Sequence, residues 1–343
     1  MKNMPEPRKT YRKVITSPER IEQINPINKK FVERYLKNFA TKRSPKSVVA
    51  YRSNFNIFFC WNLIYNDNIP FTDIKKLDMQ DFFDFALTDL KWKSNRYAQM
   101  HSSLSELSKY IEKFYDEKYP TFRNLLTFID KLPKENCREK SVFKKDEMNK
   151  LMDWLGEINR PNEQCLLALI MSSGSRASEL VRFTTDMIDY HNTVFEDLFL
   201  ETTRKVRVKG MGVEGKDISR YLIKDLFTPY YDKYLPIRER IMEQNNQEHD
   251  YIFVKQNGEP ATIHTIRGWM EKWDQKLTQH WYPHAGRHFW TSYLIGVGLE
   301  KQLVQELQSW SSDALVDIYN DNTAKDVKWK GLSKLKDELA KSN

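Results

Sequence analysis

Five side chains in the second half of the sequence could take part in catalysis. They are Arg176, His284, Arg287, Trp310 and Tyr319. Arginines bind anions through planar sets of donors, histidine exchanges protons near neutral pH, and tyrosine can act as a nucleophile. Taken singly, each has an ordinary explanation, because Arg176 could pair with Glu179 one helical turn away and aromatic residues usually belong to a core. Only their order and spacing can give them a joint function.

Two sequence motifs contain the arginines. The first is SSGSRASELV at 172–181, in which a small residue, a glycine and an arginine precede a Glu-Leu pair. The second is HAGRHFWTSYLIGVG at 284–298, in which an HxxRH pattern opens a helix-like run that ends at a glycine. Both motifs resemble those of the tyrosine recombinase (phage integrase) family, and they lie towards opposite ends of one expected domain.

The third part of the resemblance is the run Leu307-Gln-Ser-Trp310 followed by Asp317-Ile-Tyr319. Trp310 follows Arg287 by 23 residues and Tyr319 follows Trp310 by 9, and both intervals are similar to those of the family. Many members have Leu-Gly-His where this sequence has Gln-Ser-Trp, but a tryptophan here resembles the Cre-like variant. Tyr319 is also the last of the 17 tyrosines, so no later tyrosine competes for its role.

The family places a catalytic lysine on a β-hairpin, and the run VRVKGMGVEGKDISRYL is the expected hairpin. Lys209 ends its first strand and Lys216 lies in its turn, whereas the commonest family form has lysine between two glycines, where this chain has Met211. We favour Lys209, keep Lys216 as the alternative, and regard Lys205 as a third candidate.

The resemblance implies a role for each residue in breaking and rejoining DNA. Arg176 and Arg287 are expected to hold the non-bridging oxygens of the scissile phosphate, and Trp310 to orient it through its indole N–H. His284 would assist deprotonation of Tyr319, whose ordinary pKa is about 10, while the lysine would protonate the 5′ oxygen. Because the 3′-phosphotyrosyl bond conserves the energy of the ester, we expect no ATP. Because the arginines supply the positive charge, we expect no metal ion or other cofactor.

The resemblance also implies partners. They are double-stranded DNA with specific core sites, a homotetramer of the chain assembled on two such sites, and DNA-bending accessory factors. We expect a monomer when the protein is free in solution. By family frequency, the leading hypothesis for the biological task is integration or excision of a mobile element.

Hydrophobic periodicity indicates the elements that must position these residues. Four helical stretches follow one another between about 28 and 119, and the clearest opens at Ser44-Pro45, a good N-cap and first-turn pair. Residues 132–140 are polar and without periodicity, which indicates a domain boundary. Beyond them, helical stretches precede short β-like runs at about 194–223, and further helices follow.

These patterns predict a mainly α chain with a small antiparallel β-sheet in its C-terminal domain. The resemblance implies an all-helical, SAM-like core-binding domain followed by an α+β catalytic domain, the two forming a clamp around DNA. We expect four segments: a basic flexible arm at 1–25, the core-binding domain at 26–135, the catalytic domain at 141–325, and a tail helix at 326–343. The tail helix would dock on a neighbouring protomer, or alternatively pack on its own chain.

The positive charge is concentrated in the N-terminal part. Residues 1–140 hold 27 basic against 17 acidic side chains, a net charge of +10, whereas residues 141–343 have a net charge of −2. A domain that grips phosphates needs such a field. The candidate DNA-binding residues are Lys42, Arg43, Lys46, Arg52, Lys91, Lys93 and Arg96.

Cysteine content and hydropathy indicate the compartment. The three cysteines, Cys60, Cys137 and Cys165, have no metal-type spacing and do not suggest a disulfide framework. The N-terminus lacks an apolar signal core, and the longest apolar run is far below the ~20 residues that span a bilayer. We expect no membrane partner and a cytoplasmic, nucleoid-associated protein of bacterial, phage or other mobile-element origin.

Three other functions are compatible with parts of the sequence. They are a DNA-binding repressor that keeps the recombinase fold without cleavage, a topoisomerase that uses the same phosphotyrosine chemistry, and a helical interaction protein that binds an acidic protein surface. The presence of the complete set of catalytic side chains argues against the first and the last of these. Steep salt dependence of binding would separate DNA from a protein partner.

Overall fold

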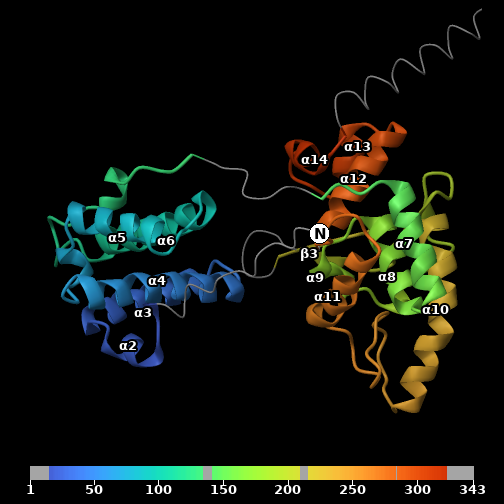
Figure 1. Cartoon of the computed structure of the whole chain (residues 1–343), viewed down its shortest axis with the longest axis horizontal. Coiled ribbons are helices and arrows are strands. Elements are labelled where there is room, and N and C mark those ends of the chain that lie inside the picture. The colour runs from blue at the N-terminus through green and yellow to red at the C-terminus, as the bar shows by residue number, and fades with distance from the viewer. Residues whose placement is uncertain (1–14, 134–140, 209–214, 283, 323–343) are drawn as a thin grey trace, which may run out of the picture. The chain divides into compact units, whose positions relative to one another are not determined.

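The structure, a computed structural model, describes residues 15–133, 141–208, 215–282 and 284–322. The chain divides into two compact units, one formed mainly by residues 15–133 and the other mainly by residues 141–322 (Figure 1). None of the helices in these described ranges is both long enough and apolar enough to span a membrane.

The first unit is built from helices alone, as the sequence predicts. Ser44 caps one of the two longest helices of the unit, its hydroxyl accepting a hydrogen bond from the Ser47 backbone N–H at 3.3 Å, and Pro45 occupies the first turn. The elements are α2 (Pro18–Gln23), α3 (Pro26–Ala40), α4 (Pro45–Tyr65), η1 (Phe71–Asp73), α5 (Lys76–Thr88), α6 (Ser94–Phe114) and η2 (Leu125–Phe128).

Aromatic side chains dominate the core of this unit. Phe58 makes edge-on contacts with Phe71 and Phe82, with ring centroids 5.7 and 4.8 Å apart, and all three rings are buried. Such pairs add stabilisation beyond the apolar area that they bury. The unit therefore has a hydrophobic core of its own.

The prediction that residues 1–25 form an unpacked arm is wrong for residues 15–25. Ser17 caps α2, and Ile15 and Ile24 on either side of that helix are buried in the core of the first unit. Burying these two apolar side chains offsets the entropy lost when the segment is ordered. The rest of the arm, residues 1–14, lies outside the described residues, as does the expected tail helix at 326–343.

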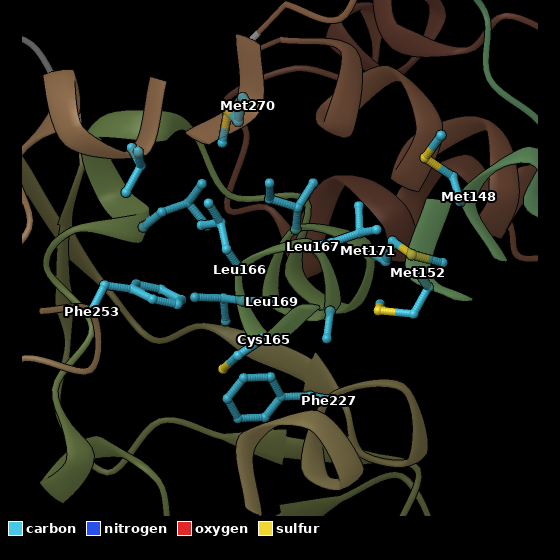
Figure 2. Close-up of a cluster of buried hydrophobic side chains, with 14 of the residues drawn as sticks. Met148, Met152, Cys165, Leu166, Leu167, Leu169, Met171, Phe227, Phe253 and Met270 are labelled. Carbon is cyan, nitrogen blue, oxygen red and sulfur yellow. The ribbon is translucent and has the colours of Figure 1, made fainter. Parts of the chain in front are cut away.

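The second unit surrounds one buried helix, α8 (Pro161–Ser173). Its side chains from Glu163 onward are all buried, and Figure 2 shows Cys165, Leu167 and Leu169 pointing away from its axis in different directions. A helix that is apolar on every side belongs in the middle of a domain. The other α-helices of this unit are α7 (Lys145–Glu157), α9 (Ala177–Leu180), α10 (Lys224–Gln244), α11 (Ile263–Glu271), α12 (Ala285–Val297), α13 (Lys301–Leu307) and α14 (Ala314–Tyr319).

The β-structure of the described residues is small and antiparallel, as predicted, but it forms two sheets rather than one. One sheet has the order β1-β2-β5, and the other pairs β3 with β4. Val208 lies opposite Lys216 in the second sheet, so the predicted hairpin is present. The strands are β1 (Thr193–Val194), β2 (Phe199–Glu201), β3 (Val206–Val208), β4 (Lys216–Ile218) and β5 (Tyr221–Ile223).

Gly174 ends α8 and brings the next segment close to α12. Gly174 has a φ of +57°, in the left-handed region, and its N–H donates to the Ile170 carbonyl. A Cβ at this position would lie 2.8 Å from the Trp290 ring and 2.9 Å from Nε2 of Gln308. Both the backbone conformation and the close packing therefore require glycine here.

Gly174→Ala is expected to lower the thermal midpoint clearly. An alanine in the left-handed conformation costs about 1 kcal/mol, and its Cβ would also clash with the Trp290 ring. Gly268→Ala is the matched control, since Gly268 lies within α11 and a Cβ there meets nothing within 4 Å. The control should be neutral or stabilise by about 0.5 to 1 kcal/mol. Equal midpoints for the two variants in calorimetry would contradict this account.

Candidate active site

Arg176 lies directly before α9, at the N-cap position. Its side-chain Nη1 donates to Oε1 of Glu179 at 2.9 Å, and its backbone N–H donates to Oε2 of the same carboxylate at 3.0 Å. The pairing that would make Arg176 an ordinary surface residue is thus present. However, the Glu179 side chain is fully buried, so this is not a surface ion pair.

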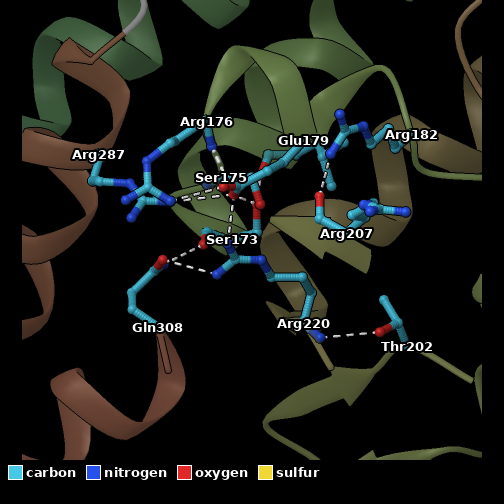
Figure 3. A network of polar contacts seen from close by, with 11 residues as sticks. Ser173, Ser175, Arg176, Glu179, Arg182, Thr202, Arg207, Arg220, Arg287 and Gln308 are labelled. Atoms are coloured by element: carbon cyan, nitrogen blue, oxygen red, sulfur yellow. Dashed lines mark hydrogen bonds and ion pairs between the residues drawn. The ribbon is translucent and has the colours of Figure 1, made fainter. Parts of the chain in front are cut away.

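The Glu179 carboxylate holds three arginines together (Figure 3). In addition to Arg176, Nη2 of Arg287 lies 3.3 Å from Oε2, and Nη2 of Arg220 donates to the same oxygen. Arg220 and Arg287 are both buried, with side chains about 1% exposed. Guanidinium groups from three distant parts of the sequence therefore converge on one carboxylate.

The carboxylate and the arginines of this cluster stabilise one another in their charged forms. Burial alone would raise the pKa of Glu179, but Arg220 and Arg287, together with Arg176, outweigh it and hold the pKa below its usual value. Burial lowers the pKa of Arg220 and of Arg287, and the Glu179 carboxylate opposes that effect. Arginine stays protonated in proteins. The cluster consequently holds one negative and three positive charges.

Arg220 and Gln308 belong to this site but were not predicted from the sequence. Arg220 lies between β4 and β5, where its backbone N–H donates to Oγ1 of Thr202 at 3.0 Å and its Nη1 donates to Oε1 of Gln308 at 2.9 Å. Nε2 of Gln308 in turn donates to the Ser173 carbonyl at 2.6 Å. A lone arginine in a strand-like run gives no signal, whereas Gln308 falls in the run that departs from the family's usual Leu-Gly-His.

Several buried donors at this site have no hydrogen-bond acceptor among the described residues. They are Nε and Nη1 of Arg287, Nε of Arg220 and Nε1 of Trp310. The Arg287 guanidinium carbon lies 5.6 Å from the centre of the Trp310 ring, so two of these side chains are neighbours. A buried donor without an acceptor costs about 1 to 3 kcal/mol, which an anionic ligand would recover.

Tyr319 lies beside these donors. Its ring is stacked on that of Trp310, with centroids 5.2 Å apart and planes inclined by 22°, and the Arg287 guanidinium carbon lies 5.8 Å from its centre. The centre of the His288 ring is 4.9 Å from that of the Tyr319 ring. The structure thus brings Arg176, Arg287, Trp310 and Tyr319 of a single chain together.

His284 occupies the N-cap position of α12, one turn before Arg287. The residue is exposed, yet reduced hydration lowers the pKa of its imidazole, and the positive charges of Arg287 and Arg176 lower it further. A lowered pKa keeps this histidine neutral at pH 7, in the form that can accept a proton.

Ser309 explains a detail of the third motif. Its φ is +50°, so the turn between α13 and Trp310 requires a residue in the left-handed backbone conformation. Glycine adopts this conformation without cost, which is consistent with the Leu-Gly-His that the family commonly has here. The serine keeps the same turn, and the backbone N–H of Trp310 donates to the Gln305 carbonyl at 3.0 Å.

The structure does not decide which lysine belongs to the site. Lys209, the favoured candidate, lies outside the described residues. Lys216 is the first residue of β4 and is exposed, and Lys205 is exposed before β3. The identity of the general acid stays a prediction.

The predicted DNA-binding residues lie in the first unit near the starts of two helices. Lys42, Arg43 and Lys46 are exposed around the start of α4, and Arg52 on the same helix pairs with Glu33. Near the start of α6, Lys91 and Lys93 are exposed, and Arg96 lies over the Trp92 ring with its guanidinium carbon 4.4 Å from the ring centre. Their contact with DNA stays a prediction.

Comparison with known proteins identifies the class. Residues 141–326, which are 186 of the 343, match the family model described as the phage integrase family. The chain therefore belongs to the phage integrase family, and it is a tyrosine-type site-specific recombinase.

Relatives and solved structures agree with this assignment. The chain is 25% identical over 293 residues to tyrosine recombinase XerC of Lacticaseibacillus casei, covering 83% of this chain and 91% of that protein. It is 26% identical over 248 residues to the SPbeta prophage-derived recombinase-like protein YomM of Bacillus subtilis, covering 71% and 70%. A structure of the Tn1549 transposon integrase with circular intermediate DNA has a similar fold, with a TM-score of 0.63, 13% identity, and coverage of 89% and 98%.

Glu179→Gln is expected to lower the free energy of unfolding by about 3 to 5 kcal/mol at pH 7, because it leaves buried arginines without a counter-charge. The lowered pKa of Glu179 implies that its contribution is complete above the ordinary glutamate pKa of about 4.3, and is lost as the pH falls through the lower folded-state value. The difference between wild type and variant should therefore shrink below about pH 4.

Urea unfolding followed by tryptophan fluorescence measures this difference. Glu157→Gln, at an exposed position at the end of α7, is the matched control and should behave as wild type at every pH. A difference for Glu179→Gln that stays constant from pH 7 to about pH 3 would argue that the carboxylate has no special role.

Proposed function

We propose that this recombinase cleaves and rejoins duplex DNA through a 3′-phosphotyrosyl intermediate, with Tyr319 as the nucleophile. The observation that carries the proposal is the position of Tyr319 beside buried donors that have no acceptor within the described residues. A phosphodiester oxygen is the kind of acceptor that such donors fit. The tyrosine would then lie next to the phosphorus that it attacks.

The arginines would stabilise the transition state. Arg287 would donate from its free Nε and Nη1, and Arg176 would add a second guanidinium while Glu179 holds both in place. Trp310 would donate through its free Nε1 and support the Tyr319 ring by stacking. Donors fixed in advance at the place where negative charge develops lower the barrier most effectively.

Two groups would transfer the protons. His284, kept neutral by its lowered pKa, would accept the proton of the Tyr319 hydroxyl as the Oη–P bond forms. The hairpin lysine, Lys209 or alternatively Lys216, would give a proton to the 5′ oxygen as the P–O5′ bond breaks. A new 5′ hydroxyl reverses these steps and releases Tyr319, so no ATP is needed.

The proposal extends to the wider assembly. Related structures include a lambda integrase tetramer bound to a Holliday junction, at 17% identity and a TM-score of 0.62. For this chain we propose a monomer in solution and four protomers on two DNA sites, with the first unit gripping DNA and accessory factors bending it. We also propose that it integrates or excises a mobile element inside a bacterial cell.

The proposal predicts a covalent protein–DNA adduct in EDTA. Wild-type protein incubated with labelled element-end DNA, nicked near the cleavage point, should give a species that survives SDS. Tyr319→Phe keeps the ring stacked on Trp310 but lacks the nucleophile, so it should bind the DNA and yield no adduct.

The adduct assay, combined with assays of DNA relaxation and strand exchange, separates a recombinase from a repressor and from a topoisomerase. Tight DNA binding by wild type without an adduct on any nicked substrate would favour a DNA-binding repressor. An adduct accompanied by relaxation of supercoiled DNA, with no strand exchange between two sites, would favour a topoisomerase.

A substrate with sulfur at the 5′ bridging position should identify the general acid. A thiolate leaves without protonation, so the variant that lacks the true acid should cleave ordinary DNA ~10² to 10⁴-fold more slowly and recover with the sulfur substrate. We expect Lys209→Ala to show this recovery. Lys216→Ala is the matched control in the same hairpin, and recovery of that variant instead would transfer the role to Lys216.

A further inference from the structure

The segment that follows Tyr319 is attached to α12 by hydrogen bonds. Oγ of Ser292 accepts from the Asp321 backbone N–H at 2.7 Å and donates to the Tyr319 carbonyl at 3.4 Å. Nδ2 of Asn322 donates to the Ser292 carbonyl at 2.8 Å. One serine of α12 therefore binds the backbone on both sides of residue 320.

A second attachment lies one turn earlier on α12. Nδ1 of His288 is 2.9 Å from Oδ2 of Asp321, and both side chains are buried, with 9% and 5% exposed. The same imidazole contacts the Tyr319 ring. This contact is within ion-pair distance but lacks the geometry of a hydrogen bond, so it supports the position of the chain after Tyr319 together with the bonds of Ser292.

Helix α14 needs such support. It has six residues, and Asp317 and Ile318 are exposed, so it offers little apolar surface to the rest of the unit. A helix this short is not stable by itself. Its place is therefore set by Val316 in the core, by the rings that contact Tyr319, and by the attachments of residues 319–322.

We propose that the attachments of residues 319–322 to Ser292 and His288 form a clamp that positions the Tyr319 hydroxyl over a phosphate bound by Arg287 of the same chain. This inference rests on the proposed function, since it assumes that Tyr319 attacks that phosphate. Ser292 and Asp321 are positioning residues, because they hold the backbone and not the reacting atoms. A misplacement of about 1 Å in a nucleophile can cost a hundred-fold in rate.

The test compares the rate of adduct formation with DNA affinity. Ser292→Ala removes the hydroxyl that binds both the Tyr319 carbonyl and the Asp321 N–H. At saturating protein we expect single-turnover cleavage of nicked DNA about ten-fold slower than wild type, with an unchanged Kd. Ser292→Thr retains the hydroxyl and should recover most of the rate.

Tyr293→Phe is the matched control, because it removes one hydroxyl from the next residue of the same helix. That hydroxyl accepts a hydrogen bond from Lys145 instead. It should cleave at the wild-type rate. Asp321→Ala should be slowed like Ser292→Ala. If Ser292→Ala lowers the thermal midpoint, Asn322→Ala, which removes a bond outside the helix, decides between a positioning effect and unfolding.

The clamp is overturned if folded Ser292→Ala or Asn322→Ala cleaves as fast as wild type, or if Kd weakens as much as the rate falls. These outcomes are distinct from failure of the proposed function, in which wild type itself forms no adduct.

Discussion

The site depends on a single buried carboxylate. Glu179 neutralises only one of the three arginine charges that meet on it, so a buried group keeps two positive charges in excess. An isolated buried guanidinium would strongly destabilise the folded state. Glu179 reduces this electrostatic penalty but does not neutralise all of the positive charge. The remaining positive charge favours binding of an anion, and the Arg287 donors that lack an acceptor among the described residues set where such an anion would lie.

The apolar scaffold gives this carboxylate a fixed position. Helix α8 is packed on every side, and Gly174 turns the chain so sharply that Arg176 and α9 follow within three residues. Close packing transmits the position of such a helix to its neighbours, because the interior yields little. Gly286 on α12 continues this constraint, since a Cβ there would lie 2.2 Å from Ile170.

The sequence predicted well those features that leave a local pattern. The helix at Ser44-Pro45, the hairpin pairing and the joint position of Arg176, Arg287, Trp310 and Tyr319 are all present in the structure. Features that depend on distant partners could not be predicted. The Arg220–Gln308 bond joins residues 88 apart, and the order of residues 15–25 depends on apolar contacts with the rest of the first unit.

The order of the site along the chain has a consequence for synthesis. The arginines that meet on Glu179 come from the segments at Arg176, Arg220 and Arg287, whereas α14, which contains Tyr319, comes after all of them. Domains form as their segments emerge from the ribosome, so the anion-binding cluster can assemble before the nucleophile is available. If the cluster binds a DNA phosphate and Tyr319 attacks it, as proposed, a partly made chain can hold the phosphate before it can cut it, and strand breakage has to wait until α14 has been made.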